Sequence, residues 1–234
     1  MLGDLKNFVK AIKLIHRIPK MEEKLDLLVW ETPDIPPEFF RRLTESARKM
    51  GWLESAKQHK PITADGEPCP WYTYPSLYFL DTKQLSELRI FEYGSGNSTL
   101  WWSRKAASVV SVEHNREWFE LISEQRPPNV TYVYRDLVPG GDYSTEVTRH
   151  QDTPFDIVVI DGRDRVNCAK ATMSLQQRPS AIIWDNSERE RYQEGCDLLT
   201  ANGYRRIDFD GFGPINGRPW RTTVFYTSDN CLKI

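Results

Sequence analysis

Short apolar runs alternate with helical stretches along the part of the chain that follows Arg89. Two of these runs, Ile157–Ile160 and Ala181–Trp184, show no alternation of polar and apolar residues. Strands that are covered by helices on both faces have this pattern, which indicates a parallel sheet between two helix layers. We predict seven strands, at Arg89–Tyr93, Ser108–Glu113, Val130–Tyr134, Phe155–Ile160, Ala181–Trp184, Tyr204–Phe209 and Thr222–Tyr226.

Helical spacing fills most of the gaps between these strands. We predict helices at about Ser98–Ala106, Arg116–Glu124, Arg165–Gln176 and Ser187–Ala201. The last link, Asp210–Arg221, is short and rich in glycine and proline. A parallel crossover normally contains a helix, so this link predicts an antiparallel hairpin instead. The expected fold class is α/β, with a doubly wound, mostly parallel seven-stranded sheet whose last strand is antiparallel.

The first 85 residues have a different character. Apolar residues at helical spacing predict an amphipathic helix in residues 5–15, and a second helix is expected at about 38–50. The segment Pro61–Leu80 combines prolines, which we expect to forbid regular structure, with a group of aromatic rings. Such a segment suits a lid over a ligand, and the alternative is a loop that its rings pin to the core. We therefore divide the chain into an N-terminal helical and aromatic lid region, 1–85, and an α/β domain, 86–234.

Charge and composition narrow the function classes. The chain carries 31 basic and 33 acidic residues, a net charge of −2, which argues against a nucleic-acid substrate. No apolar run reaches the roughly 18 residues that a membrane helix needs, so no integral membrane association is expected. The N-terminal segment lacks the continuous apolar region of a signal peptide, and the cysteines form no disulfide or metal pattern. We expect a cytoplasmic protein, and the sequence predicts no oligomeric state.

The most informative segment joins the first predicted strand to the helix that follows it. It reads Glu92-Tyr93-Gly94-Ser95-Gly96 and continues to Thr99. Two close glycines let the backbone turn sharply and let a ligand approach it. A bound dinucleotide would require a small residue where Thr99 stands, and the Glu92 carboxylate would repel its pyrophosphate. The segment therefore favours S-adenosylmethionine, a ligand with an ammonium group and a sulfonium.

A second acid, Glu113, ends the second predicted strand, 17 positions after Gly96 (113 − 96). A carboxylate at this place accepts both hydroxyl groups of an adenosine ribose. This feature is shared by the two kinds of cofactor and does not discriminate between them.

These features together resemble the class I S-adenosylmethionine-dependent methyltransferases. The resemblance covers about residues 89–226 and is carried by the terminal hairpin and by residues at strand ends, namely Glu92, Gly94, Gly96, Glu113 and Asp161. It implies a Rossmann-like domain in which Glu92, Gly94 and Gly96 hold the methionine end of S-adenosylmethionine and Glu113 holds the ribose. It also implies an adenine contact after the third strand, for which Asp136 is the candidate.

Two acids and an amide follow neighbouring strands of the predicted sheet. Asp161 ends the fourth strand, and Asp185 and Asn186 follow the fifth. Ligands bind beyond the carboxyl ends of strands in such sheets, so Asp161 and Asp185 are the catalytic candidates. Their oxygens, with that of Asn186, suit Mg²⁺ or another divalent cation, and the set resembles that of metal-dependent catechol-type O-methyltransferases. The alternative is that Asp185 and Asn186 cap the next helix.

The acceptor and the reaction follow from the same region. Arg163 and Arg165, close to Asp161, suit an anionic acceptor that carries a carboxylate or a phosphate. We predict methyl transfer from S-adenosylmethionine to an oxygen of a small molecule or sugar, assisted by a divalent metal. Three alternatives stay open: N-methylation or aminopropyl transfer in the same fold, a nicotinamide-dependent oxidoreductase, and a non-catalytic protein whose amphipathic N-terminal helix binds a partner.

Overall fold

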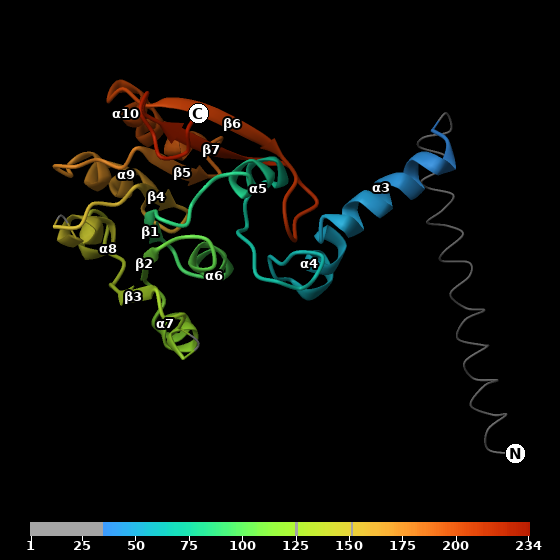
Figure 1. Ribbon diagram of the computed structural model, residues 1–234, viewed down its shortest axis with the longest axis horizontal. Helices are drawn as coiled ribbons and strands as arrows, with labels where there is room; N and C mark the ends of the chain where they lie inside the picture. Colours follow the sequence, from blue (N-terminus) through green and yellow to red (C-terminus); the bar gives the residue numbers. More distant parts are fainter. Residues whose placement is uncertain (1–34, 125, 151) are drawn as a thin grey trace, which may run out of the picture. The chain divides into compact units, whose positions relative to one another are not determined.

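A computed structural model describes residues 35–124, 126–150 and 152–234 of the chain (Figure 1). The chain separates into two compact units, Met1–Ser46 and Ala47–Ile234, and the predicted amphipathic helix in residues 5–15 lies outside the described residues. The predicted helix at 38–50 is present as α3, Pro37–Lys49.

A seven-stranded sheet forms the centre of the second unit, in the order β3-β2-β1-β4-β5-β7-β6. The last strand, β7, is antiparallel to both of its neighbours, and the other neighbouring strands are parallel. This confirms the mostly parallel sheet and its terminal hairpin. The strands are β1 (Arg89–Tyr93), β2 (Ser108–Glu113), β3 (Val130–Tyr134), β4 (Ile157–Ile160), β5 (Ala181–Asp185), β6 (Arg205–Gly211) and β7 (Trp220–Tyr226).

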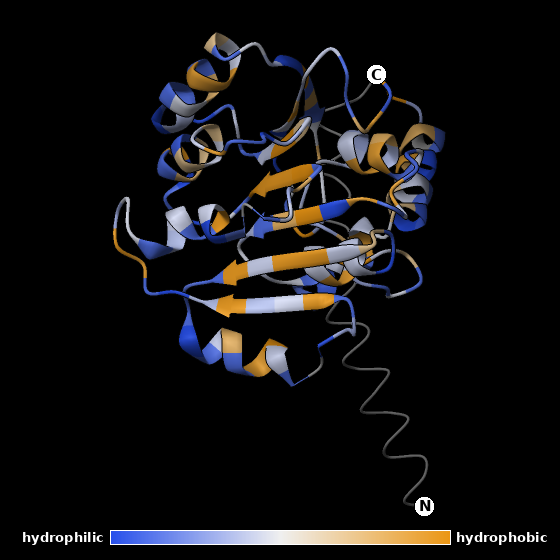
Figure 2. Cartoon of the chain, turned by 60° about the vertical axis from the view of Figure 1, so that its left-hand side comes forward, coloured by the Kyte–Doolittle hydropathy of each residue, from blue (hydrophilic) through white to orange (hydrophobic). Residues whose placement is uncertain are grey.

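Helices cover the sheet on both faces, as the continuous apolar runs predicted. Side chains alternate between the faces, so Val158 and Ile182 join one buried cluster while Val159 and Ile183 join the other. Figure 2 shows the middle strands largely hydrophobic and the helices mixed. The connecting helices are α4 (Trp52–Gln58), α5 (Tyr74–Asp81), α6 (Asn97–Ser103), α7 (Arg116–Ser123), α8 (Asp142–Thr145), α9 (Arg165–Met173) and α10 (Gln193–Ala201).

The prediction for the segment Pro61–Leu80 was partly wrong. Its prolines do not prevent regular structure, because Pro75 stands in the first turn of α5, where a helix needs no amide hydrogen. Tyr72 and Leu80 are fully buried in a cluster that includes sheet residues, so this segment packs in the same unit as the sheet. Trp71 is 42% exposed, so only part of the aromatic segment is pinned to the core.

The chain after β5 also differs from the prediction. The expected helix at Ser187–Ala201 is divided into a short 3₁₀ helix, Glu190–Tyr192, and α10. Asp185 and Asn186 therefore do not cap α10, whose first residue is Gln193. The segment between β5 and α10 instead follows the carboxyl edge of the sheet.

Candidate functional site

The order of the strands reverses between β1 and β4, and this point determines where a ligand can bind. A glycine follows each strand within two residues, and the two backbones approach closely: a Cβ atom on Gly94 would lie 2.9 Å from the Cα atom of Gly162. Gly94 also has a φ of 91°, which side chains rarely adopt. The glycines thus keep the crevice between the two strand ends narrow and free of side chains.

The side chain of Glu92 stabilises the glycine turn through hydrogen bonds with neighbouring hydroxyl groups. Its side chain is fully buried, and its Oε2 accepts hydrogen bonds from the hydroxyls of Thr99 and, at 3.1 Å, Ser111. The Thr99 hydroxyl also accepts a hydrogen bond of 3.0 Å from the amide of Gly96. Burial raises the pKa of Glu92 to about 7, against the lowering effect of these hydroxyls. The other oxygen, Oε1, is buried without a hydrogen-bond partner among the described residues.

Glu113, the last residue of the neighbouring strand β2, also binds the backbone of the turn. Its Oε2 accepts a hydrogen bond of 3.1 Å from the amide of Ser95. Its Oε1 accepts bonds of 2.7 Å from the amides of His114 and Asn115. Each carboxylate oxygen has about two acceptor sites, so Oε2 keeps one for a ligand. That Glu113 accepts both ribose hydroxyls stays a prediction, and the acceptor site left on Oε2 is available to a ribose hydroxyl.

These residues surround a cavity of about 280 Å³, which we call the glycine-turn cavity. Its acids are Glu113 and Asp161, and its cations come from the loops after β4 and β5. The lining residues are Gly94, Ser95, Ser98, Glu113, His114, Asp161, Gly162, Arg163, Arg165, Arg189, Arg191 and Tyr192.

A second cavity, of about 370 Å³, opens at the carboxyl ends of β4 and β5, and we call it the two-tryptophan cavity. Asp161, Arg165 and Arg189 line both cavities. The two spaces therefore meet at these side chains. The lining residues are Trp71, Asp161, Arg165, Asp185, Asn186, Arg189, Asn216 and Trp220.

Asp161 and Asp185 are brought together, as predicted, but their environments differ. Asp185 is buried, and its Oδ1 accepts hydrogen bonds from the Trp220 indole at 2.8 Å and the Thr222 hydroxyl at 2.6 Å. Burial raises the pKa of Asp185 well above its usual range, and the charge of Asp161 adds to this. Burial raises the pKa of Asp161 to about 6, against the lowering effect of Arg165. As the pH rises, Asp161 therefore ionises before Asp185.

The side chain of Arg165 occupies the space between the two strand ends. Its Nη2 donates hydrogen bonds to the Oδ1 of Asp161 at 3.0 Å and to the carbonyl of the same residue at 2.8 Å. Its Nη1 donates to the carbonyl of Asp185, and its Nε to that of Gly162 at 2.9 Å. Arg165 is buried and pairs with Asp161, so the predicted contact of this residue with an anionic acceptor stays a prediction.

This guanidinium bears directly on the predicted metal site. A divalent cation at Asp161, Asp185 and Asn186 would lie beside a buried positive charge that Asp161 already neutralises. The Oδ1 of Asp185 is occupied by two donors. Among the described residues there is no group of three or more His, Cys, Asp or Glu side chains that could hold a metal ion. The residues present do not fit a divalent cation, and the metal prediction is unsupported.

The remaining predicted residues lie in distinct places. Asn186 lines the two-tryptophan cavity with a φ of 54°, a conformation that asparagine tolerates better than most residues. Gly96 lies at the turn, and no atom is within 4 Å of the position that a Cβ would take. Asp136 is exposed, accepts a hydrogen bond of 2.6 Å from the Tyr134 hydroxyl, and lines neither cavity.

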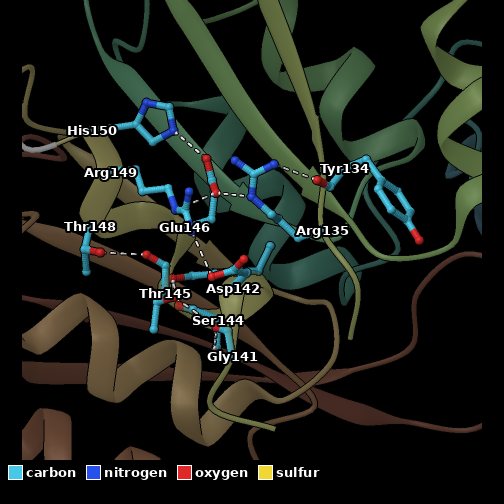
Figure 3. A network of polar contacts seen from close by, with 11 residues as sticks. Tyr134, Arg135, Gly141, Asp142, Ser144, Thr145, Glu146, Thr148, Arg149 and His150 are labelled. Carbon is cyan, nitrogen blue, oxygen red and sulfur yellow. Dashed lines mark hydrogen bonds and ion pairs between the residues drawn. The ribbon is translucent and has the colours of Figure 1, made fainter. Parts of the chain in front are cut away.

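The connection between β3 and β4 contacts the loop after β4 and so supports the site. Figure 3 shows the buried carboxylate of Glu146 between Arg135, Arg149 and His150. Arg135 lies 2.6 Å from Glu146, and His150 lies 3.2 Å from it. This cluster holds the chain next to Tyr143, whose hydroxyl accepts a hydrogen bond of 3.3 Å from the amide of Arg163. The loop after β4 is thereby fixed.

Sequence reasoning missed three residues of the site: Trp220, Arg189 and Arg191. Trp71 lies in the aromatic segment that was predicted as a lid, whereas Trp220 is far in the chain from the other site residues and no local motif marks it. The two arginines had a weak signal, because Arg189-Glu190-Arg191 follows a strand end. The predicted helix Ser187–Ala201 covers this segment, so the sequence does not distinguish the two arginines from ordinary helix residues.

Comparisons with known proteins identify the fold. No protein-family model and no curated protein matches the chain. Among solved structures, a precorrin-6y C5,15-methyltransferase from Geobacter metallireducens is 14% identical with a TM-score of 0.50, over 65% of this chain and 87% of that one. The chain has the fold of class I S-adenosylmethionine-dependent methyltransferases, which confirms the predicted fold class.

Two further solved structures are similar to part of this chain. A methyltransferase-like protein from Silicibacter pomeroyi is 27% identical with a TM-score of 0.46, over 67% of this chain and 89% of that one. An rRNA methylase from Streptococcus thermophilus is 13% identical with a TM-score of 0.49, over 66% of this chain and 96% of that one.

The part of the chain that the structure describes contains no helix long and apolar enough to cross a membrane.

Proposed function

We propose that this chain transfers a methyl group from S-adenosylmethionine to an oxygen nucleophile of a small molecule or sugar. The observation that carries the proposal is the position of Asp161, which lines both cavities at the place where they meet. A donor in the glycine-turn cavity and an acceptor in the two-tryptophan cavity would have Asp161 between them.

The residues of the glycine-turn cavity fit the methyl donor. Glu92 keeps one buried oxygen without a partner beneath the turn, which suits the donor's ammonium group directly or through water. Glu113 keeps one acceptor site for a ribose hydroxyl, and the space above Gly96 lets the ligand reach the backbone. When bound, S-adenosylmethionine supplies a methyl group on a positively charged sulfur, which needs no further activation.

Asp161 is the proton acceptor in this proposal. With a pKa of about 6, its carboxylate is mostly ionised at neutral pH and basic enough to help a hydroxyl lose its proton. Asp161 takes that proton while the acceptor oxygen bonds to the methyl carbon and the carbon–sulfur bond breaks. Arg165 holds the Asp161 carboxylate in place through a hydrogen bond. Asp185 keeps its proton to higher pH and accepts a hydrogen bond from the Trp220 indole, which positions that ring in the cavity lining. No metal takes part.

A second candidate, a nicotinamide-dependent oxidoreductase, is favoured by one observation. Arg163, Arg189 and Arg191 line the glycine-turn cavity, and arginines there could bind a pyrophosphate. The buried Glu92 beneath the turn argues against it, because a carboxylate repels phosphate groups.

Separate titrations with S-adenosylhomocysteine and NADH test the two functions. We expect S-adenosylhomocysteine to bind and NADH to bind far more weakly. Incubation of the S-adenosylhomocysteine-competent protein with labelled S-adenosylmethionine and a panel of hydroxylated small molecules then tests the transfer. Label that appears only on amines would contradict the preference for oxygen.

A further inference from the structure

Guanidinium groups from two loops converge on the glycine-turn cavity. Arg163 and Arg165 follow β4, and Arg189 and Arg191 follow β5. Only Arg165 is buried and paired with a carboxylate at close range, that of Asp161 at 3.0 Å. Arg189 has one distant contact of 3.9 Å, to Glu188. Neither Arg163 nor Arg191 forms an ion pair with a carboxylate of the described residues, so three cations face the cleft with little compensation.

The arrangement costs electrostatic free energy as long as no anion enters. The guanidiniums of Arg165 and Arg191 lie 5.1 Å and 4.8 Å from the centre of the same ring, that of Tyr192. Like charges that line one cavity repel one another, and an anion in the cavity would relieve this repulsion. The only acids that line this cavity, Glu113 and Asp161, are already engaged by backbone amides and by Arg165.

The proposed methyl donor cannot balance these charges. It carries one carboxylate, which occupies one guanidinium at most in a bidentate contact, and it adds two positive charges, on nitrogen and sulfur. At least two of the three arginines therefore still lack a close negative partner after the donor has bound. The acceptor is the other molecule that must bind, so it can supply the missing negative charge.

Arg189 is the arginine best placed to meet the acceptor. Of the three uncompensated arginines, it alone also lines the two-tryptophan cavity. Two indoles, the exposed Trp71 and the buried Trp220, line that cavity too and offer flat apolar surfaces. A planar ring suits such surfaces, and an anionic substituent on the ring would come within the reach of Arg189.

We propose that the two-tryptophan cavity binds a planar acceptor that carries a carboxylate or phosphate group, and that Arg189 selects it by binding this anion. The assignment of this molecule as a methyl acceptor rests on the proposed function. The preference of the cavity for an anion does not, because it follows from the charges that line it.

The preference can be measured with matched probes on the full chain saturated with S-adenosylhomocysteine. 4-Hydroxybenzoate and 4-hydroxybenzamide have the same shape and differ in one group, a charged carboxylate against a neutral amide, and phenyl phosphate represents the phosphate class. Calorimetry should show at least about tenfold tighter binding of one anionic probe than of the amide, because hydrogen bonds to a charged group are the stronger kind. The tighter of the two anions distinguishes a carboxylate site from a phosphate site.

The Arg189→Gln variant then assigns the preference to its residue. We expect it to bring the anionic probe and the amide to similar affinity, measured at S-adenosylhomocysteine concentrations that saturate this variant, since Arg189 lines the donor cavity as well. Arg205→Gln is the matched control, because Arg205 is exposed on β6 and lines neither cavity, and it should keep the preference. A circular dichroism melt of each variant confirms that it is folded.

The outcomes separate this inference from the proposed function. Equal binding of charged and neutral probes by the wild-type protein, or no binding of any, would overturn the anion site. So would an anion preference that survives in Arg189→Gln. Failure of S-adenosylhomocysteine to bind would instead count against methyl transfer, while the probe preference, measured without it, would still stand.

Discussion

The two halves of the cleft are built in different ways. In the half at β1 and β2, the acids Glu92 and Glu113 belong to short motifs at strand ends, and neighbouring amides and hydroxyls hold them. In the half at β4 and β5, Asp161 and Asp185 lie beside the buried Arg165. The indoles of Trp71 and Trp220 line the same cavity. The first half is assembled locally, whereas the second depends on segments that are distant in sequence.

This difference has a consequence for the chemistry. A carboxylate held by several backbone amides, as Glu113 is, serves recognition. Burial raises the pKa of both Asp161 and Asp185, but to different extents, so one can accept a proton while the other still holds its own. The first half is therefore suited to binding, and the second to the transfer of a proton.

Replacing Asp161 should have the largest effect. We expect Asp161→Asn to lower turnover with an identified acceptor by about 10²- to 10⁴-fold, since a positioned base contributes on that order. Binding of S-adenosylhomocysteine should persist, because asparagine keeps the shape of the side chain. Rates from a labelled-methyl assay and affinities from calorimetry give both numbers.

The pH profile provides the matching test. Wild-type turnover should fall as the pH drops below about 6, where Asp161 takes up a proton. Asp136→Asn is the control, since Asp136 is exposed and lines neither cavity, and its turnover should equal that of the wild type. Unchanged turnover in Asp161→Asn would remove the distinction between the two halves.

Filling the glycine turn should have the next largest effect and should act on binding alone. Gly96 has an extended backbone with a φ of 171° and free space where a side chain would start, so Gly96→Val should fold normally. The valine would occupy the space that the ligand needs and weaken S-adenosylhomocysteine binding by about ten- to a hundredfold. Gly217→Val, at another glycine with free space, should bind like the wild type. Equal affinity of the two variants would show that the ligand does not approach Gly96.

The Glu92→Gln variant should separate stability from binding. Burial raises the pKa of Glu92 from 4.5 to about 7, so the folded state holds this proton more tightly than the unfolded state. The stabilisation is complete below pH 4.5 and is lost as the pH rises through 7. Glutamine, which is always neutral, should make the protein more stable than the wild type at pH 8, by up to about 2–3 kcal/mol.

Urea unfolding at pH 5 and pH 8 measures this difference. The same variant should bind S-adenosylhomocysteine more weakly, because the charge that attracts the ligand's ammonium group in the proposed function is lost. A variant that is less stable than the wild type at pH 8 would contradict the pKa of about 7 for Glu92.

Divalent cations should have the smallest effect, close to none. Arg165 already places a positive charge between the two strand ends, so calorimetric titration with Mg²⁺ or Mn²⁺ should show no binding at the cleft. Turnover should also be insensitive to excess EDTA. Saturable Mn²⁺ binding that Asp185→Asn abolishes would restore the metal site that the sequence predicted.

The sequence was sufficient to predict the sheet because buried parallel strands leave continuous apolar runs such as Ile157–Ile160. It located the glycine turn because the turn lies in five consecutive residues. It indicated Trp71 only as part of an aromatic segment, and it could not locate Trp220 in the site, because only tertiary packing brings that residue there. It could not predict that Arg165 is buried, because the fold alone brings together the backbone carbonyls that bind it.

The central claim, that the glycine turn binds S-adenosylmethionine rather than a dinucleotide, has one direct test. Calorimetry of the full chain at pH 7.5 (about half a pH unit above the pKa of Glu92) with S-adenosylhomocysteine and then NADH compares the two ligands on the same site. We predict saturable binding of S-adenosylhomocysteine that Gly96→Val weakens, and little or no binding of NADH. Tight binding of NADH without binding of S-adenosylhomocysteine would contradict the proposed function.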